Sequence, residues 1–295
     1  MTEEHLIEAV DPDEVFALLA DETRILILQA LWEAESETLS FSTLRESVGM
    51  RDAGQFNYHL GKLVGHLIKK TDDGYTLSPA GESVIGAILS GAFTMKGDVT
   101  PIQLPNQCST CDDEPLWFEV DQNYVTITCN ECEKASTFPI PPSVLAGYPA
   151  EAFPSVAQQY VRTLIQNLRR GFCPTCSGAV QPTIGTFGDG SNEVPSIADQ
   201  VVIRFQCDKC GQTHQNDPVS FFLSEPVVVS YFHTRGVNIE DISIWNLSQY
   251  VGEPASTTAE TDQRHVTLTF TTEEDCLTLT VDDSLDIIES MISER

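Results

Sequence analysis

The chain has 295 residues and a strongly unbalanced charge, with 44 Asp and Glu against 16 Lys and Arg and a formal net charge of −28. At roughly 100 to 200 residues per domain, this length predicts two or three domains and excludes a single small module. Hydrophobic residues make up 41% of the chain, which is too many for a disordered acidic protein. We therefore expect a folded protein with an acidic surface, which repels nucleic acid and anionic membranes at low salt.

The acidic surface also indicates the solvent in which the chain works. Repulsion between surface carboxylates is screened in concentrated salt, where the Debye length falls to about 3 Å at 1 M. The composition therefore favours a halophilic protein. No apolar run approaches the roughly 18 residues that a membrane span needs, and residues 1–10 carry acids rather than a basic signal-peptide region. We expect a cytoplasmic protein.

Helix start signals are frequent in the first 90 residues. Asp11 followed by Pro12 is typical of a helix start, because the Asp side chain caps the helix and proline fits its first position. Apolar residues at helical spacing follow each signal, and a hairpin is predicted around Asp72, Asp73 and Gly74. Further caps are predicted at Asp21, at Ser40 or Ser42, and at Ser78.

The stretch from Arg51 to Lys70 is amphipathic when it is placed on a helix. Phe56, Leu60 and Leu63 share a face that predicts burial in a core. The opposite face is a narrow polar stripe. Four helices, a hairpin and a final helix follow one another in the order of a winged helix-turn-helix. The stripe is formed by Arg51, Gln55, Tyr58 and Lys62.

Residues 17–28 (ALLADETRILIL), 58–63 (YHLGKL) and 72–74 (DDG) resemble the ArsR-like winged helix-turn-helix transcription regulators over about residues 10–92. The resemblance implies a DNA-binding homodimer whose fourth helix lies in the major groove and whose wing reaches the flanking backbone. The chain departs from arsenic-sensing members because residues 43–48 contain no cysteine. The whole arrangement is similar to regulators of halophilic archaea.

The distribution of charge gives an independent reason to expect DNA contact. Residues 41–74 hold five basic and four acidic residues, a net of +1, whereas the other 261 residues hold 11 and 40, a net of −29. Phosphate contact needs local cations, and base reading needs polar side chains at groove depth. The alternative is that the polar stripe is only a solvated helix face. We favour DNA binding, with Arg51, Gln55, Tyr58 and Lys62 reading bases and Lys69, Lys70 and Tyr75 in or near the wing.

Eight of the nine cysteines form four C-x-x-C pairs. In a cytoplasmic chain this pattern predicts metal binding rather than disulfides. Zinc prefers four soft ligands in a tetrahedron, and each C-x-x-C turn offers two thiolates. We therefore expect two Zn²⁺ per chain, held by Cys108, Cys111, Cys129 and Cys132 and by Cys173, Cys176, Cys207 and Cys210.

The spacers between the pairs predict two zinc ribbons. The 17 residues between Cys111 and Cys129 contain two predicted strands, 116–120 and 124–128. The second spacer has 30 residues and one clear strand, 201–206, so the second ribbon is looser. The neighbouring bases Lys134, Lys209 and Arg204 suit compensation of the thiolate charge.

The remaining segments predict a small α+β unit at the end of the chain. It includes a helix over 226–234, a hairpin about 272–275, a final helix near 285–292, and Cys276 as a small buried hydrophobe. The fold class is thus α+β. The predicted parts are a winged helix-turn-helix over 1–95, a first ribbon over 104–140, a linker and helix over 141–171, a second ribbon over 172–216, and the α+β unit over 217–295.

Together these observations predict a sequence-specific transcriptional regulator, not an enzyme, that binds double-stranded DNA as a homodimer through its N-terminal domain. The ribbons would bind a protein partner or respond to an effector. One alternative is a general transcription factor that binds RNA polymerase, because a winged helix followed by a zinc ribbon also resembles the large subunit of general factor E. A second alternative is a thiol-redox or zinc enzyme, although a closed four-thiolate site leaves no open position for water.

Overall fold

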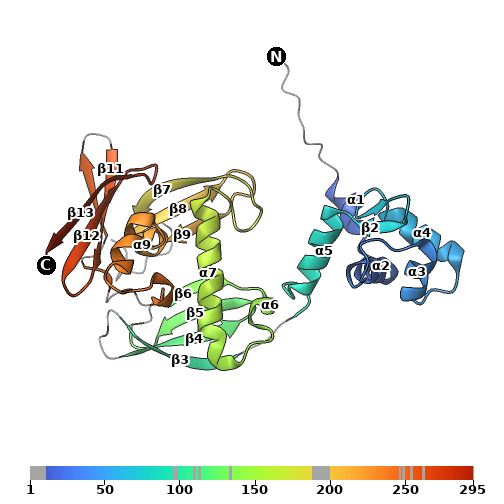
Figure 1. Ribbon diagram of the computed structural model, residues 1–295, viewed down its shortest axis with the longest axis horizontal. Coiled ribbons are helices and arrows are strands. Elements are labelled where there is room, and N and C mark those ends of the chain that lie inside the picture. The colour runs from blue at the N-terminus through green and yellow to red at the C-terminus, as the bar shows by residue number, and fades with distance from the viewer. Residues whose placement is uncertain are drawn as a thin grey trace, which may run out of the picture. The chain divides into compact units, whose positions relative to one another are not determined.

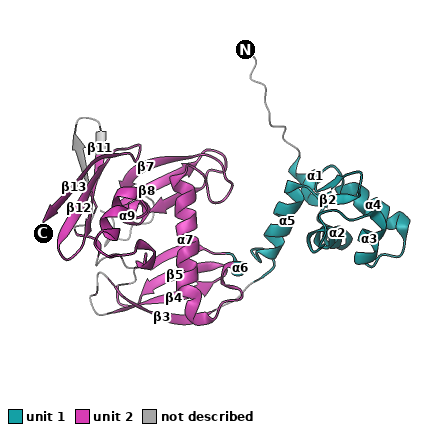
Figure 2. Cartoon of the chain, in the orientation of Figure 1, with its two compact units in different colours: residues 1–96, 141–143 teal, residues 97–140, 144–295 magenta. Residues whose placement is uncertain are grey.

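The computed structural model describes residues 11–95, 99–108, 111, 114–132, 135–187, 200–245, 247, 250–252, 255–260 and 263–294. Its helices and small antiparallel sheets confirm the predicted α+β class (Figure 1). The chain forms two compact units, Met1–Lys96 with Pro141–Ser143 and Gly97–Ile140 with Val144–Arg295 (Figure 2). Within the described ranges, no helix has the length and apolar character needed to cross a membrane.

In its described residues, 11–95, the first unit forms five helices and one hairpin. The side chains that cap its helices accept a backbone N–H from the first turn, which confirms the caps predicted at Asp11, Asp21, Ser40 and Ser78. The elements are α1 (Pro12–Ala17), α2 (Glu22–Trp32), α3 (Phe41–Ser47), α4 (Ala53–Leu63), β1 (Ile68–Lys70), β2 (Tyr75–Leu77) and α5 (Pro79–Leu89).

Helix α4 is shorter than the amphipathic stretch in the sequence. Asp52 caps it, with a carboxylate oxygen 2.8 Å from the amide nitrogen of Gln55, so Arg51 lies before the helix and not on it. The helix ends at Leu63, because the chain then turns at Gly65, where φ is +91°, and enters β1. The prediction that Arg51 shares a helix face with Gln55 is therefore wrong.

The core of the first unit is built from its own helices. Phe56, Leu60 and Leu63 of α4 are buried against Leu28 of α2 and Ile85 of α5. The hairpin is held tightly against this core. Gly74 has a φ of +147°, and a Cβ atom there would overlap the carbonyl oxygen of Leu39, so only glycine fits the turn.

The described residues of the second unit form three antiparallel sheets. The first has the order β3-β4-β5-β6, the second β7-β8-β9, and the third β10-β11-β12-β13. The strands are β3 (Val99–Gln107), β4 (Pro115–Asp121), β5 (Tyr124–Cys129), β6 (Ala135–Pro139), β7 (Val180–Thr186), β8 (Val201–Cys207), β9 (Thr213–Asn216), β10 (Ser256–Glu260), β11 (Gln263–Thr271), β12 (Asp275–Val281) and β13 (Ile287–Glu294).

Helix α7 (Phe153–Arg169) packs against both cysteine-bearing sheets. Ala157, near its start, is buried in the core of the first sheet, whereas Val161 and Ile165, further along, are buried in the core that includes the second and third sheets. Figure 1 shows α7 running past β5 and β7. The shorter helices are α6 (Pro142–Leu145), α8 (Pro218–Phe222), α9 (Pro226–His233) and two 3₁₀ turns, Ala150–Ala152 and Ile239–Asp241.

The end of the chain corrects one prediction. Residues 285–292 are predicted as a helix, but the structure has strand β13 there. This strand pairs with β12, so that Ile292 lies opposite Leu277. Asp282 forms the turn that precedes the strand, because its carboxylate accepts the backbone amides of Ser284 and Asp286. Pairing with β12 satisfies backbone groups that would otherwise lie on an open sheet edge.

Candidate metal centres and polar surface

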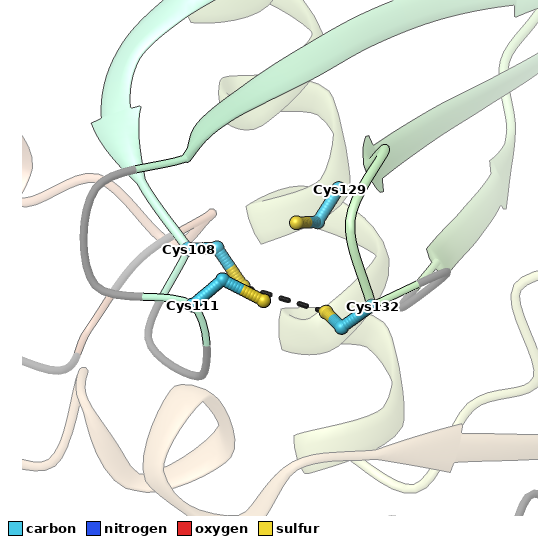
Figure 3. A group of neighbouring side chains, drawn as sticks. All are labelled: Cys108, Cys111, Cys129 and Cys132. Atoms are coloured by element: carbon cyan, nitrogen blue, oxygen red, sulfur yellow. Dashed lines mark hydrogen bonds between the residues drawn. The ribbon is translucent and has the colours of Figure 1, made fainter.

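The first four-cysteine group lies at the end of the β3-β4-β5-β6 sheet. Cys108 follows β3 and Cys129 ends β5, so the antiparallel strands bring the two C-x-x-C turns together. The four sulfur atoms lie within 4.8 Å of one another, and those of Cys108 and Cys132 are 3.7 Å apart. Figure 3 shows the four side chains converging from the two turns. This group can hold a metal ion.

The second group lies between α7 and the β7-β8-β9 sheet. Its sulfur atoms also lie within 4.8 Å of one another, with 3.8 Å between Cys173 and Cys210 and 3.4 Å between Cys176 and Cys207. Gly178 is closely confined there. A Cβ atom at this position would lie 2.8 Å from the Cβ atom of Lys209 and 3.2 Å from the Cys207 sulfur, so the turn leaves no room for a side chain.

Both groups have the dimensions of a four-thiolate metal site. Zn–S bonds of about 2.3 Å in a tetrahedron place the sulfur atoms about 3.8 Å apart. The sulfur–sulfur distances of 3.4 to 3.8 Å given above are close to this value and far longer than a disulfide bond of about 2.05 Å. All eight cysteines are free, and each group contains two buried cysteines.

The thiols within each group oppose one another's ionisation. The backbone amide of Gln212 lowers the pKa of Cys210, but desolvation and the neighbouring thiols together raise that pKa to about 12. Hydrogen bonding to Cys132, together with desolvation, raises the pKa of Cys111 well above its usual range. By contrast, the backbone amides of Cys210 and Lys209 lower the pKa of Cys207 to about 7. Four thiolates in so small a space require a bound cation.

His214 is a neighbour of the second group that the sequence did not reveal. Its Nε2 atom lies 3.4 Å from the sulfur of Cys173. Burial lowers the pKa of this histidine, so the ring is neutral at pH 7. A neutral imidazole can donate one N–H to a thiolate. The position follows from the pairing of β8 with β9, in which His214 lies opposite Phe205.

The bases predicted to compensate thiolate charge behave differently from one another. Lys134 lies outside the described residues. Lys209 lies within the second C-x-x-C turn, where its backbone amide donates to Cys207. Arg204 donates to the carbonyl oxygen of Thr186. The ninth cysteine, Cys276, is half-buried on β12, and its sulfur lies 3.1 Å from the hydroxyl oxygen of Ser293, away from both groups.

The residues predicted to contact DNA lie in the first unit and are mostly exposed. Gln55, Tyr58 and Lys62 are exposed on α4, and Arg51 is exposed just before it. Two further predicted residues, Lys69 and Lys70, are exposed on β1. The exposed polar residues thus lie on two consecutive elements, α4 and β1, which are joined by only four residues, 64–67.

Tyr75 differs from the other predicted contact residues, because it is half-buried and packs against the core. It lies opposite Lys70 in the hairpin. Its amide donates to the carbonyl oxygen of Leu39 at 2.9 Å, and the Leu39 amide donates back at 3.0 Å. Tyr75 thus fastens the hairpin to the segment that precedes α3.

Comparison with known proteins gave two family matches. Residues 12–88, which contain nearly all of the ordered elements of the first unit, match a family described as "Domain of unknown function (DUF7347)". No curated protein and no solved structure matched the chain. A second family matches residues 105–287, more than half of the chain, which include both four-cysteine groups. The chain belongs to this family, which is described as "Domain of unknown function (DUF7351)".

Proposed function

We propose that the chain is a sequence-specific DNA-binding transcriptional regulator of the ArsR-like winged helix-turn-helix kind. One observation carries the proposal: α4 and the β1-β2 hairpin expose polar and basic side chains within residues 41–74, whose net charge is +1 against −29 for the rest of the chain. The rest of the chain is strongly acidic and repels DNA. Helices α3 and α4 with the hairpin then serve as the helix-turn-helix and its wing.

The dimensions of α4 suit the major groove. An α-helix with its side chains is about 10 to 12 Å in diameter, and the groove is about 12 Å wide. Gln55 lies in the first turn and is exposed, and its side-chain amide can both donate to and accept from a base edge. Lys69 and Lys70 project from the wing and contact phosphates, which positions α4 without reading sequence.

Because the proposed DNA-binding surface has few basic residues, contacts to phosphates alone cannot supply most of its affinity for DNA. Each phosphate contact contributes a slope of about −0.9 to the dependence of log affinity on log salt. The proposed surface has only four basic residues for such contacts, so the affinity falls only gradually as salt is added. The four residues are Arg51, Lys62, Lys69 and Lys70. Binding is therefore retained in concentrated salt if base contacts supply much of the affinity. This is the balance that a sequence-specific protein in a high-salt environment needs.

Exposed apolar side chains in the first unit support a homodimer. Phe16 is 69% exposed and Phe93 is 84% exposed, and Leu89 and Met95 are each more than half exposed. Large exposed apolar residues of this kind are typical of surfaces that are covered by a partner. The proposed partner is a second copy. Light scattering in molar KCl should give twice the chain mass, and Phe93→Ser should lower it, whereas Tyr148→Ser in the second unit should not.

The metal of both four-cysteine groups is proposed to be structural Zn²⁺. Support comes from the four-sulfur donor set and from the sulfur separations. Zinc bound there supplies folding free energy by holding the two turns together. Four protein thiolates fill the tetrahedron, so the sites have a structural role and not a catalytic one.

Selection from a random duplex pool tests the proposed function. The full chain, in molar KCl and loaded with zinc, should enrich one sequence over successive rounds. A pool that stays random, while the protein remains folded, would contradict the proposal. The general-factor alternative is distinguished by the same experiment, because it requires binding to RNA polymerase and not selection of a duplex.

A further inference from the structure

The first unit contains a shallow cavity of about 470 Å³ between α1, α2, α4 and the segment that follows α4. It is open to solvent on one side. Its walls combine the end of α1 with the exposed face of α4, so it lies beside the helix proposed to read DNA. The lining residues are Glu14, Ala17, Leu18, Arg24, Tyr58, Gly61, Lys62, Val64 and His66.

The cavity concentrates basic groups in a chain that has few. Arg24, Lys62 and His66 line it, and Glu14 is the only acid among the lining residues. The chain as a whole has 44 acidic residues against 16 Lys and Arg. A concave site with an excess of one charge focuses the field, so this cavity attracts anions that the surrounding surface repels.

Arg24 is anchored at the wall of the cavity. Its Nη2 atom donates to the carbonyl oxygen of Ala17 at 3.0 Å, which fixes the guanidinium against the end of α1. Its Nε atom is buried and has no hydrogen-bond partner among the described residues. A buried donor without a partner is costly, so a ligand that accepts from Arg24 would be stabilised there.

The other bases of the cavity are also free to bind an anion. Within the described part of the chain, neither Lys62 nor His66 forms an ion pair or a side-chain hydrogen bond. The Lys62 ammonium lies 5.8 Å from the centre of the Tyr58 ring, which holds it at the rim. The nearby carboxylate of Asp21 lies 3.4 Å from Nδ1 of His59, and although desolvation raises its pKa, the charges of His59 and Arg24 both lower it.

We infer that this cavity binds a phosphate-type oxyanion through Arg24, Lys62, His66 and the hydroxyl of Tyr58. A guanidinium, an ammonium, an imidazole and a phenol are the donors that such an anion accepts from. The oxyanion has two possible sources, the DNA backbone and a free phosphate. The first source rests on the proposed function, because Tyr58 and Lys62 belong to the face of α4 assigned to DNA. The second does not need DNA at all.

The experiment follows the Nε–H signal of Arg24 in a nitrogen-correlated NMR spectrum of the zinc-loaded full chain. Potassium phosphate replaces KCl at constant ionic strength in one arm, and a selected duplex is added in the other. A free phosphate should shift the Arg24 signal with saturation at about millimolar concentration. If the oxyanion is a DNA backbone phosphate, the Arg24 signal should shift only when duplex is added. Arg24→Gln should then weaken binding of the selected and the scrambled duplex by the same factor.

Three variants and a control keep the test decisive. Arg24→Gln also loses the bond to Ala17, so Lys62→Gln and His66→Gln, which disturb no described hydrogen bond, are measured beside it. Each should weaken oxyanion binding by about tenfold or more, because a hydrogen bond to a charged group is lost. Arg170→Gln, at an exposed position of the second unit, should change nothing.

The outcomes separate this inference from the proposed function. An Arg24 signal that responds to neither phosphate nor duplex overturns the inference, even if a duplex sequence is selected. Conversely, a saturable response to phosphate supports the cavity even if no duplex sequence is preferred, in which case the proposed function fails alone.

Discussion

The imidazole of His214 lies beside the thiol of Cys173, with 3.4 Å between Nε2 and Sγ, although the two residues are 41 positions apart in the chain. The contact joins β9 to the turn after α7. With the proton on Nε2, the imidazole donates a hydrogen bond to the second four-cysteine group, in addition to the backbone amides of that group.

His214→Gln should weaken metal binding at the second site by about 10- to 100-fold, because residues that hydrogen-bond to a metal ligand tune its affinity by that amount. Competition with a chromogenic chelator should show one of the two metals leaving sooner. The matched control is His233→Gln, at an exposed position on α9. Two metals that leave at the wild-type rates would show that the contact has no effect on the site.

Cys111→Ser should lower the metal content from two ions per chain to one, because a three-thiolate site lacks the fourth ligand that closes the tetrahedron. Elemental analysis of the folded protein measures this. Cys276→Ser is the control and should retain both ions, since Cys276 lies away from both groups. Iron in place of zinc, or full metal content in Cys111→Ser, would contradict the proposed sites.

Asp275 gives a prediction for pH. Hydrogen bonds from Arg235 and then from Tyr231 outweigh desolvation and lower the pKa of Asp275 from 3.8 to about 2. Because the pKa is lower in the folded state, ionised Asp275 stabilises the fold above about pH 4, and this contribution is lost as the pH falls toward 2.

The measurement compares the melting temperatures of wild type and Asp275→Asn from pH 7 to pH 3. Loss of metal in acid is common to both proteins, so the difference isolates the carboxylate. The difference should stay constant down to about pH 5 and shrink below pH 4. Asp283→Asn, at an exposed carboxylate, is the control. A difference in melting temperature between wild type and Asp275→Asn that grows as the pH falls would contradict a stabilising role of ionised Asp275.

Lowering KCl from molar to tenth-molar should lower the melting temperature. The screening length grows from about 3 to about 10 Å, so the carboxylates that give the folded chain its net charge of −28 repel one another more strongly. Calorimetry of the zinc-loaded chain over this range measures the effect. A melting temperature that rises as salt is removed would contradict adaptation to high salt.

Local sequence signals predicted local structure well. Asp21 accepts the amide of Thr23, as a cap should, and the C-x-x-C spacing identified all eight residues of the two cysteine groups. The start of α4 was missed, because the amphipathic pattern was extended back to Arg51, whereas Asp52 caps the helix by accepting the amide of Gln55.

Features that depend on distant segments were not predictable in this way. Ile287, Met291 and Ile292 have helical spacing, yet they form a strand because β12 offers an edge for pairing. Likewise, His214 reaches Cys173 only through the register of β8 and β9, and a single histidine four residues after Cys210 carries no signal of its own. Tertiary pairing decided both outcomes.

The most direct test of sequence-specific DNA binding is a titration of the full chain against its selected duplex and a scrambled duplex in molar KCl. Wild type should prefer the selected duplex, and Gln55→Ala should reduce that preference by about 1 to 3 kcal/mol, because a base contact is lost. Lys69→Ala and Lys70→Ala should weaken both duplexes alike, and Gln103→Ala, at an exposed position on β3, should change neither. Equal affinity of the wild-type chain for the two duplexes would contradict the account.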